Sequence, residues 1–121
     1  MAIPTAIIVD DDQDLAKIFS DLLELHQIKI IGIGYNGRDA IRLVKEKKPE
    51  FVFLDVEMPE LGGEEALKDI KKIYPKTHVI MVTGNHFANR GQFLENKASE
   101  VLYKPFDLPK IMQTIEKINR Q

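Results

Sequence analysis

Short apolar runs and helix-like patterns alternate five times along this chain. The runs are rich in β-branched residues and lack a polar face, which predicts buried strands at residues 5–9, 28–34, 51–55, 78–83 and 100–103. After each run, apolar residues recur three and four positions apart, the spacing of an amphipathic helix. The first such pattern predicts a helix whose core-facing stripe is Leu15, Ile18, Phe19, Leu22 and Leu23.

Capping and helix-breaking residues mark where several of these helices begin and end. Asn36, with Asp39 three residues later, predicts an N-terminal cap, and Pro49 predicts the end of that helix. Pro75 ends the next helical pattern, and Asp107 is predicted to cap the last one.

The helix before the fifth strand has the weakest pattern. Phe87, Leu94 and Ala98 indicate one apolar face, but Gly91 in its middle costs about 1 kcal/mol relative to alanine. We therefore expect this helix to be irregular.

Buried strands that alternate with helices indicate the fold class. Parallel strands need crossover connections, and right-handed crossovers place helices on both faces of the sheet. The pattern therefore predicts a three-layer, doubly wound α/β fold with a five-stranded parallel sheet. Five strands and five helices account for the 121 residues, so we expect a single domain over residues 1–121.

The composition narrows the class of protein further. Hydrophobic residues make up 44% and charged residues 30% of the chain, as in a globular rather than a disordered or membrane protein. No apolar run could span a bilayer and the first residues do not resemble a secretion signal, so we expect a cytoplasmic protein without a membrane partner. The absence of cysteine excludes disulfides and thiolate metal sites. A net charge of −2 argues against a nucleic-acid partner.

Several polar side chains follow directly after the predicted strands. Parallel strands all point the same way, so these side chains collect at the carboxyl edge of the sheet, where ligands bind in open α/β folds. The residues at this edge are Asp10, Asp11 and Asp12 after the first strand, Asp55 at the end of the third, Thr83 at the end of the fourth and Lys104 after the fifth.

Taken singly, these residues have ordinary structural roles, such as a helix cap for Asp12 or Asp14. Together they indicate a site for a cation and an anion. Carboxylates about 4 Å apart repel by roughly 4 kcal/mol per pair at an effective dielectric constant near 20, and a hard cation such as Mg²⁺ relieves that repulsion. Lys104 and Thr83 can then bind a phosphoryl group, with Asp55 as the nucleophile that accepts it.

Four segments, taken in order, resemble a known family. They are "IIVDDD", "FVFLDVEMPELGG", "VIMVTG" and "YKPF", and they are similar to the receiver domain of two-component response regulators, the chemotaxis-regulator-like family. The resemblance covers essentially the whole chain. It implies the flavodoxin-like strand order 2-1-3-4-5. It also implies that Asp55 accepts phosphate from the phosphohistidine of a sensor histidine kinase or a histidine-phosphotransfer protein.

The same resemblance implies roles for the other residues at this edge. The implied Mg²⁺ ligands are Asp10, Asp11, Asp55 and the main-chain carbonyl of Glu57. Thr83 and Lys104 would hold the phosphoryl oxygens, and Gly84 would leave room for them. The Lys104–Pro105 peptide bond would be cis. Glu57 and Asn85 would adjust how fast water removes the phosphate.

The sequence departs from the family pattern at a position linked to conformational switching. Most members carry an aromatic residue three positions before the lysine, whose ring turns inward as the threonine moves toward phosphate. Val101 stands there in this chain, and Tyr103, on the same face of the strand, is a candidate partial substitute. The "GG" at 62–63 replaces a common aspartate-glycine pair and is interpreted as loop variation.

The expected function is therefore signalling rather than enzymatic turnover of a substrate. The domain would catalyse only its own phosphorylation and dephosphorylation. We expect no output domain, so the signal would pass through contact with a downstream protein target or by onward phosphate transfer in a phosphorelay. The missing aromatic residue mildly favours the relay.

Two other classes compete with this interpretation. In a Mg²⁺-dependent phosphatase of the haloacid-dehalogenase type, Asp10 and Asp12 would form the D-x-D motif and Asp10 would be the nucleophile. The chain is short for that fold and has no cap domain. An FMN-binding flavodoxin would need a Ser/Thr/Gly-rich phosphate loop where this chain has carboxylates.

Overall fold

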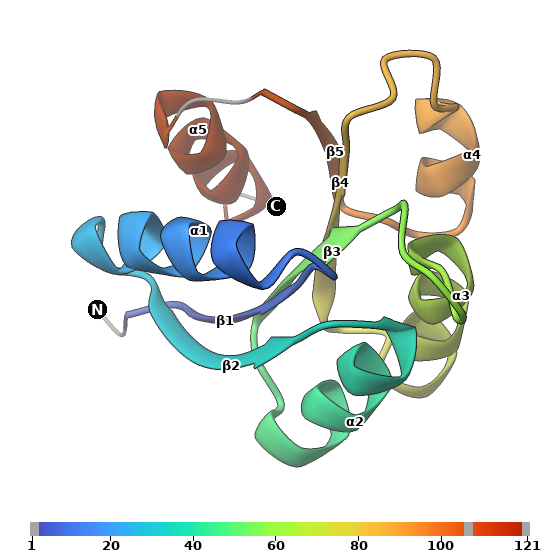
Figure 1. The fold of residues 1–121 in the computed structure, drawn as a ribbon, viewed down its shortest axis with the longest axis horizontal. Coiled ribbons are helices and arrows are strands. Elements are labelled where there is room, and N and C mark those ends of the chain that lie inside the picture. The colour runs from blue at the N-terminus through green and yellow to red at the C-terminus, as the bar shows by residue number, and fades with distance from the viewer. Residues whose placement is uncertain (1–2, 106–107, 120–121) are drawn as a thin grey trace.

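Five parallel strands form one sheet in the computed structural model, which describes residues 3–105 and 108–119 (Figure 1). The strands are β1 (Thr5–Val9), β2 (Lys29–Gly34), β3 (Phe51–Asp55), β4 (His78–Thr83) and β5 (Glu100–Tyr103). Their order across the sheet is β2-β1-β3-β4-β5. The five predicted strands, the parallel sheet and the flavodoxin-like order are thus confirmed.

Helices cover both faces of the sheet, as predicted for a doubly wound fold (Figure 1). They are α1 (Gln13–Leu25), α2 (Gly37–Lys47), α3 (Gly63–Ile73), α4 (Arg90–Glu95) and α5 (Leu108–Asn119). One core cluster joins α1 and α5 to one face of the sheet. The other joins α2, α3 and α4 to the opposite face. Because side chains alternate along a strand, β3 contributes Phe51 and Phe53 to the first cluster and Val52 and Leu54 to the second.

The predicted N-terminal caps of α1 and α2 are confirmed. The Asp12 carboxylate accepts a hydrogen bond from the Leu15 N–H at 3.1 Å and caps α1. Asn36 caps α2 by accepting from the Asp39 N–H at 2.8 Å. These bonds satisfy main-chain donors that the first turn of a helix leaves unpaired. The predicted cap at Asp107 lies outside the described residues.

The predicted apolar stripe of α1 is partly wrong. Leu15, Ile18 and Leu22 have exposed fractions of 48%, 56% and 42%, whereas Ala16 and Leu23 are buried. Ser20 is buried on the same face. α1 therefore packs through the face with Ala16, Ser20 and Leu23 and leaves part of the more hydrophobic stripe at the surface.

The buried face of α4 also differs from the predicted one. The helix has only six residues, and Gly91 lies in its first turn. Phe93 is its buried anchor, whereas Phe87 precedes the helix and is 96% exposed. Ala98 is buried beyond its end. The expectation of a weak helix is confirmed, but Phe87 does not belong to its packed face.

None of the helices described over residues 3–105 and 108–119 combines the length and apolar character needed to cross a bilayer. The expectation of a cytoplasmic location is not tested by this finding.

Gly63 begins α3 against the carboxyl end of β3, so the second glycine of the "GG" pair is more than loop variation. Its N–H donates to the Val56 carbonyl at 3.2 Å. A Cβ at this position would overlap the Asp55 carbonyl oxygen and the main chain of Val56. The absence of a side chain therefore lets α3 dock beside the residues that follow β3.

We predict that Gly63→Ala lowers the free energy of unfolding by about 1–3 kcal/mol, because main-chain atoms must move to relieve the overlap. Urea unfolding monitored by circular dichroism measures this difference. Gly84→Ala is the matched control, since a Cβ there would meet no described atom within 4 Å. Equal losses of stability in the two variants would contradict the prediction.

Candidate functional site

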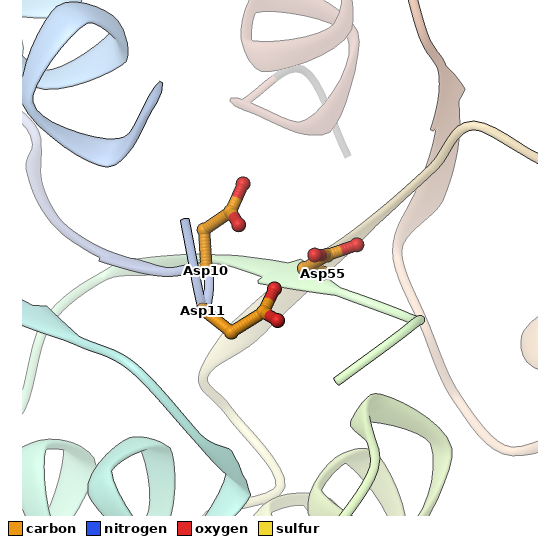
Figure 2. Close-up of side chains that lie close together, drawn as sticks. All are labelled: Asp10, Asp11 and Asp55. Carbon is orange, nitrogen blue, oxygen red and sulfur yellow. The ribbon is translucent and has the colours of Figure 1, made fainter. Parts of the chain in front are cut away.

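Three carboxylates meet at the carboxyl edge of the sheet (Figure 2). Asp10 and Asp11 follow β1, and Asp55 is the last residue of β3. These strands are neighbours, with Val9 opposite Leu54, so their ends lie side by side. One oxygen from each carboxylate lies within 4.8 Å of the others. The structure therefore brings together three of the four aspartates that the sequence placed at this edge, whereas the Asp12 side chain caps α1.

Asp55 is the buried member of this acidic cluster, with an exposed fraction of 6%. Burial raises the pKa of its carboxyl group to about 7, against the lowering effect of the nearby Lys104 ammonium. The negative charges of Asp10 and Glu57 raise this pKa further, and a main-chain hydrogen bond from Glu57 lowers it. In the absence of a cation, Asp55 is therefore only partly ionised near neutral pH.

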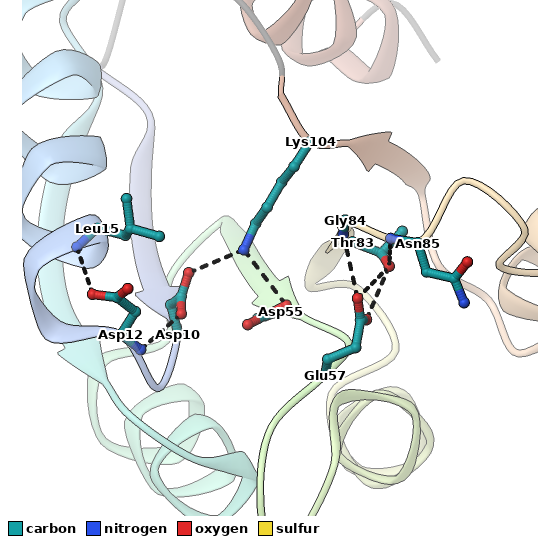
Figure 3. A network of polar contacts seen from close by, with 9 residues as sticks. All are labelled: Asp10, Asp12, Leu15, Asp55, Glu57, Thr83, Gly84, Asn85 and Lys104. Atoms are coloured by element: carbon teal, nitrogen blue, oxygen red, sulfur yellow. Dashed lines mark hydrogen bonds and ion pairs between the residues drawn. The ribbon is translucent and has the colours of Figure 1, made fainter.

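Lys104 bridges two of the carboxylates (Figure 3). Its Nζ lies 3.4 Å from Asp10 Oδ2 and 3.8 Å from Asp55 Oδ1. The main-chain N–H of Lys104 donates to the Thr83 carbonyl at 2.7 Å, which ties the lysine to the end of β4. The Lys104–Pro105 peptide bond is cis, as the resemblance implied.

Thr83 is fully buried, and its hydroxyl points toward Glu57 (Figure 3). Thr83 Oγ1 donates to the Glu57 carboxylate, with oxygen distances of 2.7 Å and 2.9 Å. The Gly84 N–H donates to the same carboxylate at 3.3 Å. The Asn85 N–H donates to Thr83 Oγ1 at 3.0 Å. From the sequence, Glu57 was expected to offer its main-chain carbonyl to the metal and to adjust the loss of phosphate, but its side-chain contact with Thr83 was not foreseen.

The acidic cluster suits a hard divalent cation. Its donors are carboxylate oxygens, the ligands that Mg²⁺ prefers, and few enough to leave positions for water and phosphate. Asp10, Asp11 and Asp55 are the side chains that could hold such an ion. The side chain of Glu57 instead turns to Thr83. The predicted use of its main-chain carbonyl stays a prediction.

The position at which the family resemblance implied a mobile aromatic ring is occupied by a core residue. Val101 is buried, with an exposed fraction of 5%. Tyr103 packs against the core cluster that contains Val101. Its ring stacks on His86, with ring centroids 5.9 Å apart and ring planes at 17°. Its hydroxyl donates to the Ala88 carbonyl at 3.4 Å. Tyr103 therefore contacts the loop between β4 and α4, which follows Thr83.

Comparisons with known proteins agree with this geometry. A family model described as "Response regulator receiver domain" matches residues 6–116. The chain is 29% identical over 115 residues to the chemotaxis protein CheY of Thermotoga maritima, covering 94% of this chain and 96% of that protein.

It is 31% identical over 121 residues to an uncharacterised response regulatory protein of Vibrio cholerae. That match covers 97% of this chain and 49% of the relative, so the chain spans about half of that protein's length. Among solved structures, a DNA-binding response regulator of the LuxR family from Staphylococcus aureus is 32% identical, with a TM-score of 0.85. The match covers 96% of this chain and 98% of that one.

The fold and the edge residues define a parallel, doubly wound α/β protein with an acidic cluster at the carboxyl edge of its sheet. The chain belongs to the response regulator receiver domain family of two-component signalling.

The raised pKa of Asp55 predicts how stability depends on pH in metal-free buffer. The folded-state pKa of about 7 lies above the unfolded value near 3.8, so the folded state binds more protons between these pH values. Stability from this group is therefore fully present below about pH 4 and falls as the pH rises through about 7.

We predict that Asp55→Asn raises the free energy of unfolding by about 1–3 kcal/mol at pH 8, because it removes the buried charge, and by much less at pH 4. Solvent at the sheet edge screens the charge and keeps the gain below the full linkage value. Urea unfolding at pH 4, 6 and 8 measures it. Asp69→Asn, at an exposed carboxylate of α3, is the control. A gain that does not vary with pH would contradict this prediction.

Proposed function

We propose that this receiver domain accepts a phosphoryl group on Asp55 from the phosphohistidine of a sensor histidine kinase or a histidine-phosphotransfer protein. The observation that carries the proposal is the placement of Asp55. Its buried carboxylate lies 3.8 Å from the Lys104 ammonium and shares a site with Asp10 and Asp11. The proposed nucleophile, the Lys104 ammonium group and two proposed metal ligands thus lie close together.

The chemical step needs little more than this positioning. A carboxylate oxygen of Asp55 forms a bond to phosphorus while the bond from phosphorus to the donor imidazole nitrogen breaks, and that nitrogen keeps the electron pair. The Lys104 ammonium favours the ionised form of Asp55 and can compensate charge on the phosphoryl oxygens. The Thr83 hydroxyl and the Gly84 N–H, at the end of the neighbouring strand β4, are neutral donors that could bind the phosphoryl oxygens.

A divalent cation fits the same group of residues. We propose that Asp10, Asp11, Asp55 and the main-chain carbonyl of Glu57 bind Mg²⁺. When bound, the ion would neutralise the carboxylates and the charge on phosphoryl oxygens. Removal of the phosphate by water would complete the cycle, so the domain would act on itself rather than turn over a separate substrate.

We propose that the signal passes from this cytoplasmic domain to a protein, either by contact with a downstream target or by onward transfer of phosphate. The net charge of −2 supports a protein rather than a nucleic-acid partner. The relay is supported by Val101, a buried aliphatic side chain with no ring to turn.

We predict that the domain binds Mn²⁺, an oxygen-preferring substitute for Mg²⁺, and that Asp11→Asn weakens binding by about tenfold because it removes one charged ligand. The loss of the free Mn²⁺ signal in electron paramagnetic resonance measures affinity. Asp14→Asn removes a nearby exposed carboxylate outside the cluster and should bind like the parent chain. Equal affinities for all three proteins would contradict the proposed ligand set.

We predict that acetyl phosphate and Mg²⁺ place one phosphoryl group on Asp55. Intact-mass spectrometry detects the adduct, and reduction with borohydride followed by peptide mapping locates it. Asp55→Asn should lose the adduct. A label on Asp10 would instead support the haloacid-dehalogenase-type reaction, and a lack of any label on the folded protein would refute the phosphoacceptor role.

A further inference from the structure

Two hydrogen-bond donors at the end of β4, the Thr83 hydroxyl and the Gly84 N–H, bind the side-chain carboxylate of Glu57. The Glu57 carboxylate accepts from Thr83 Oγ1 at 2.7 Å and 2.9 Å and from the Gly84 N–H at 3.3 Å (Figure 3). One carboxylate thus engages a side-chain and a main-chain donor of consecutive residues. A phosphoryl oxygen would use the same kinds of donor.

We propose that the Glu57 side chain is an internal competitor for the phosphoryl group, occupying its neutral donors until the group on Asp55 displaces it. This inference rests on the proposed function. It assigns to Glu57 a side-chain role distinct from the main-chain carbonyl proposed for metal binding.

The competition follows from the chemistry of the donors. The Thr83 hydroxyl has a single proton, so it cannot donate at full strength to both a carboxylate and a phosphoryl oxygen. The Glu57 carboxylate and a phosphoryl group at the same donors would also repel each other, because both carry negative charge. Occupation by one therefore disfavours occupation by the other.

The position of Glu57 comes from the pairing of β3 and β4. Asp55 lies opposite Val82, and the Val56 N–H donates to the Val82 carbonyl at 2.9 Å. Because of this pairing, Glu57, two residues after the end of β3, lies beside Thr83 at the end of β4. Glu57 is otherwise exposed, so its side chain can leave the donors without disturbing the core.

Displacement of the Glu57 side chain would also affect hydrogen bonds in the loop between β4 and α4. Thr83 Oγ1 accepts from the Asn85 N–H at 3.0 Å, and Asn85 Oδ1 accepts from the Phe87 N–H at 2.9 Å. A hydroxyl that turns from Glu57 to a phosphoryl oxygen changes the first of these bonds. The competitor is therefore linked to the segment that presents the exposed Phe87 ring.

The test is the affinity for beryllofluoride, a non-covalent phosphoryl mimic, at saturating Mg²⁺ and measured by NMR titration. We expect Glu57→Gln to bind about tenfold more tightly than the parent chain, because a neutral amide competes less well than a carboxylate for the same donors. Glu57→Ala should bind at least as tightly as Glu57→Gln.

Glu60→Gln is the matched control, since Glu60 is an exposed residue of the same loop and its substitution removes one negative charge. It should change the affinity by less than about twofold. Equal gains in Glu57→Gln and Glu60→Gln would show a general charge effect and overturn the inference. Unchanged affinity in both Glu57 variants would overturn it as well.

A second readout does not depend on phosphoryl chemistry. In metal-free protein, the Gly84 amide proton signal should move upfield in Glu57→Ala, because its carboxylate acceptor is lost, and stay unchanged in Glu60→Gln. An unshifted Gly84 signal in Glu57→Ala would overturn the inference. If this signal moves but no variant, the parent chain included, takes up beryllofluoride, then the proposed phosphoacceptor function fails while the Glu57 contact stands.

Discussion

The structure depends on an electrostatic conflict at the end of β3. Asp55 is a carboxylate in a buried position, and the charges of Asp10 and Glu57 disfavour its ionised form. Lys104 relieves this conflict only in part, from 3.8 Å away. A protein selected for stability alone would have little reason to place an acid there. The unfavourable burial of Asp55 is typical of a functional site, because binding of a positive charge there would stabilise the folded protein.

The sheet makes this conflict possible by holding distant parts of the chain in fixed positions. Asp10 and Lys104 are 94 residues apart, yet their charged groups lie 3.4 Å from each other because both follow strands of one parallel sheet. Helices cover both faces, so the strands are buried and their ends have little freedom. Gly63 adds to this order by letting α3 pack against the main chain that follows Asp55.

Polar contacts on both sides of Thr83 join the end of β4 to the neighbouring loops. Glu57 holds the threonine hydroxyl on one side, while the Asn85 N–H holds it on the other. Tyr103 reaches the same loop through its stacking on His86. Val101 is buried in the core, and the hydrogen bonds of Asn85 link Thr83 to the loop that carries Phe87.

Much of this arrangement was determined by the sequence alone, because it depends on local patterns and one topological rule. Apolar runs and capping residues predicted the strands and the start of α2, and parallel topology then placed the three aspartates together. The resemblance to a family supplied the strand order, which no local pattern contains. The chemical roles of the edge residues stay predictions.

Only the tertiary structure decided the remaining features, since each depends on contacts between distant segments. The packing of α1 on the sheet buries the face with Ala16 and leaves Ile18 of the predicted stripe exposed. The pairing of β3 with β4 brought the Glu57 side chain to Thr83, and burial set the pKa of Asp55. Periodicity reports which residues share a helix face, but packing decides which face is buried and which charges meet.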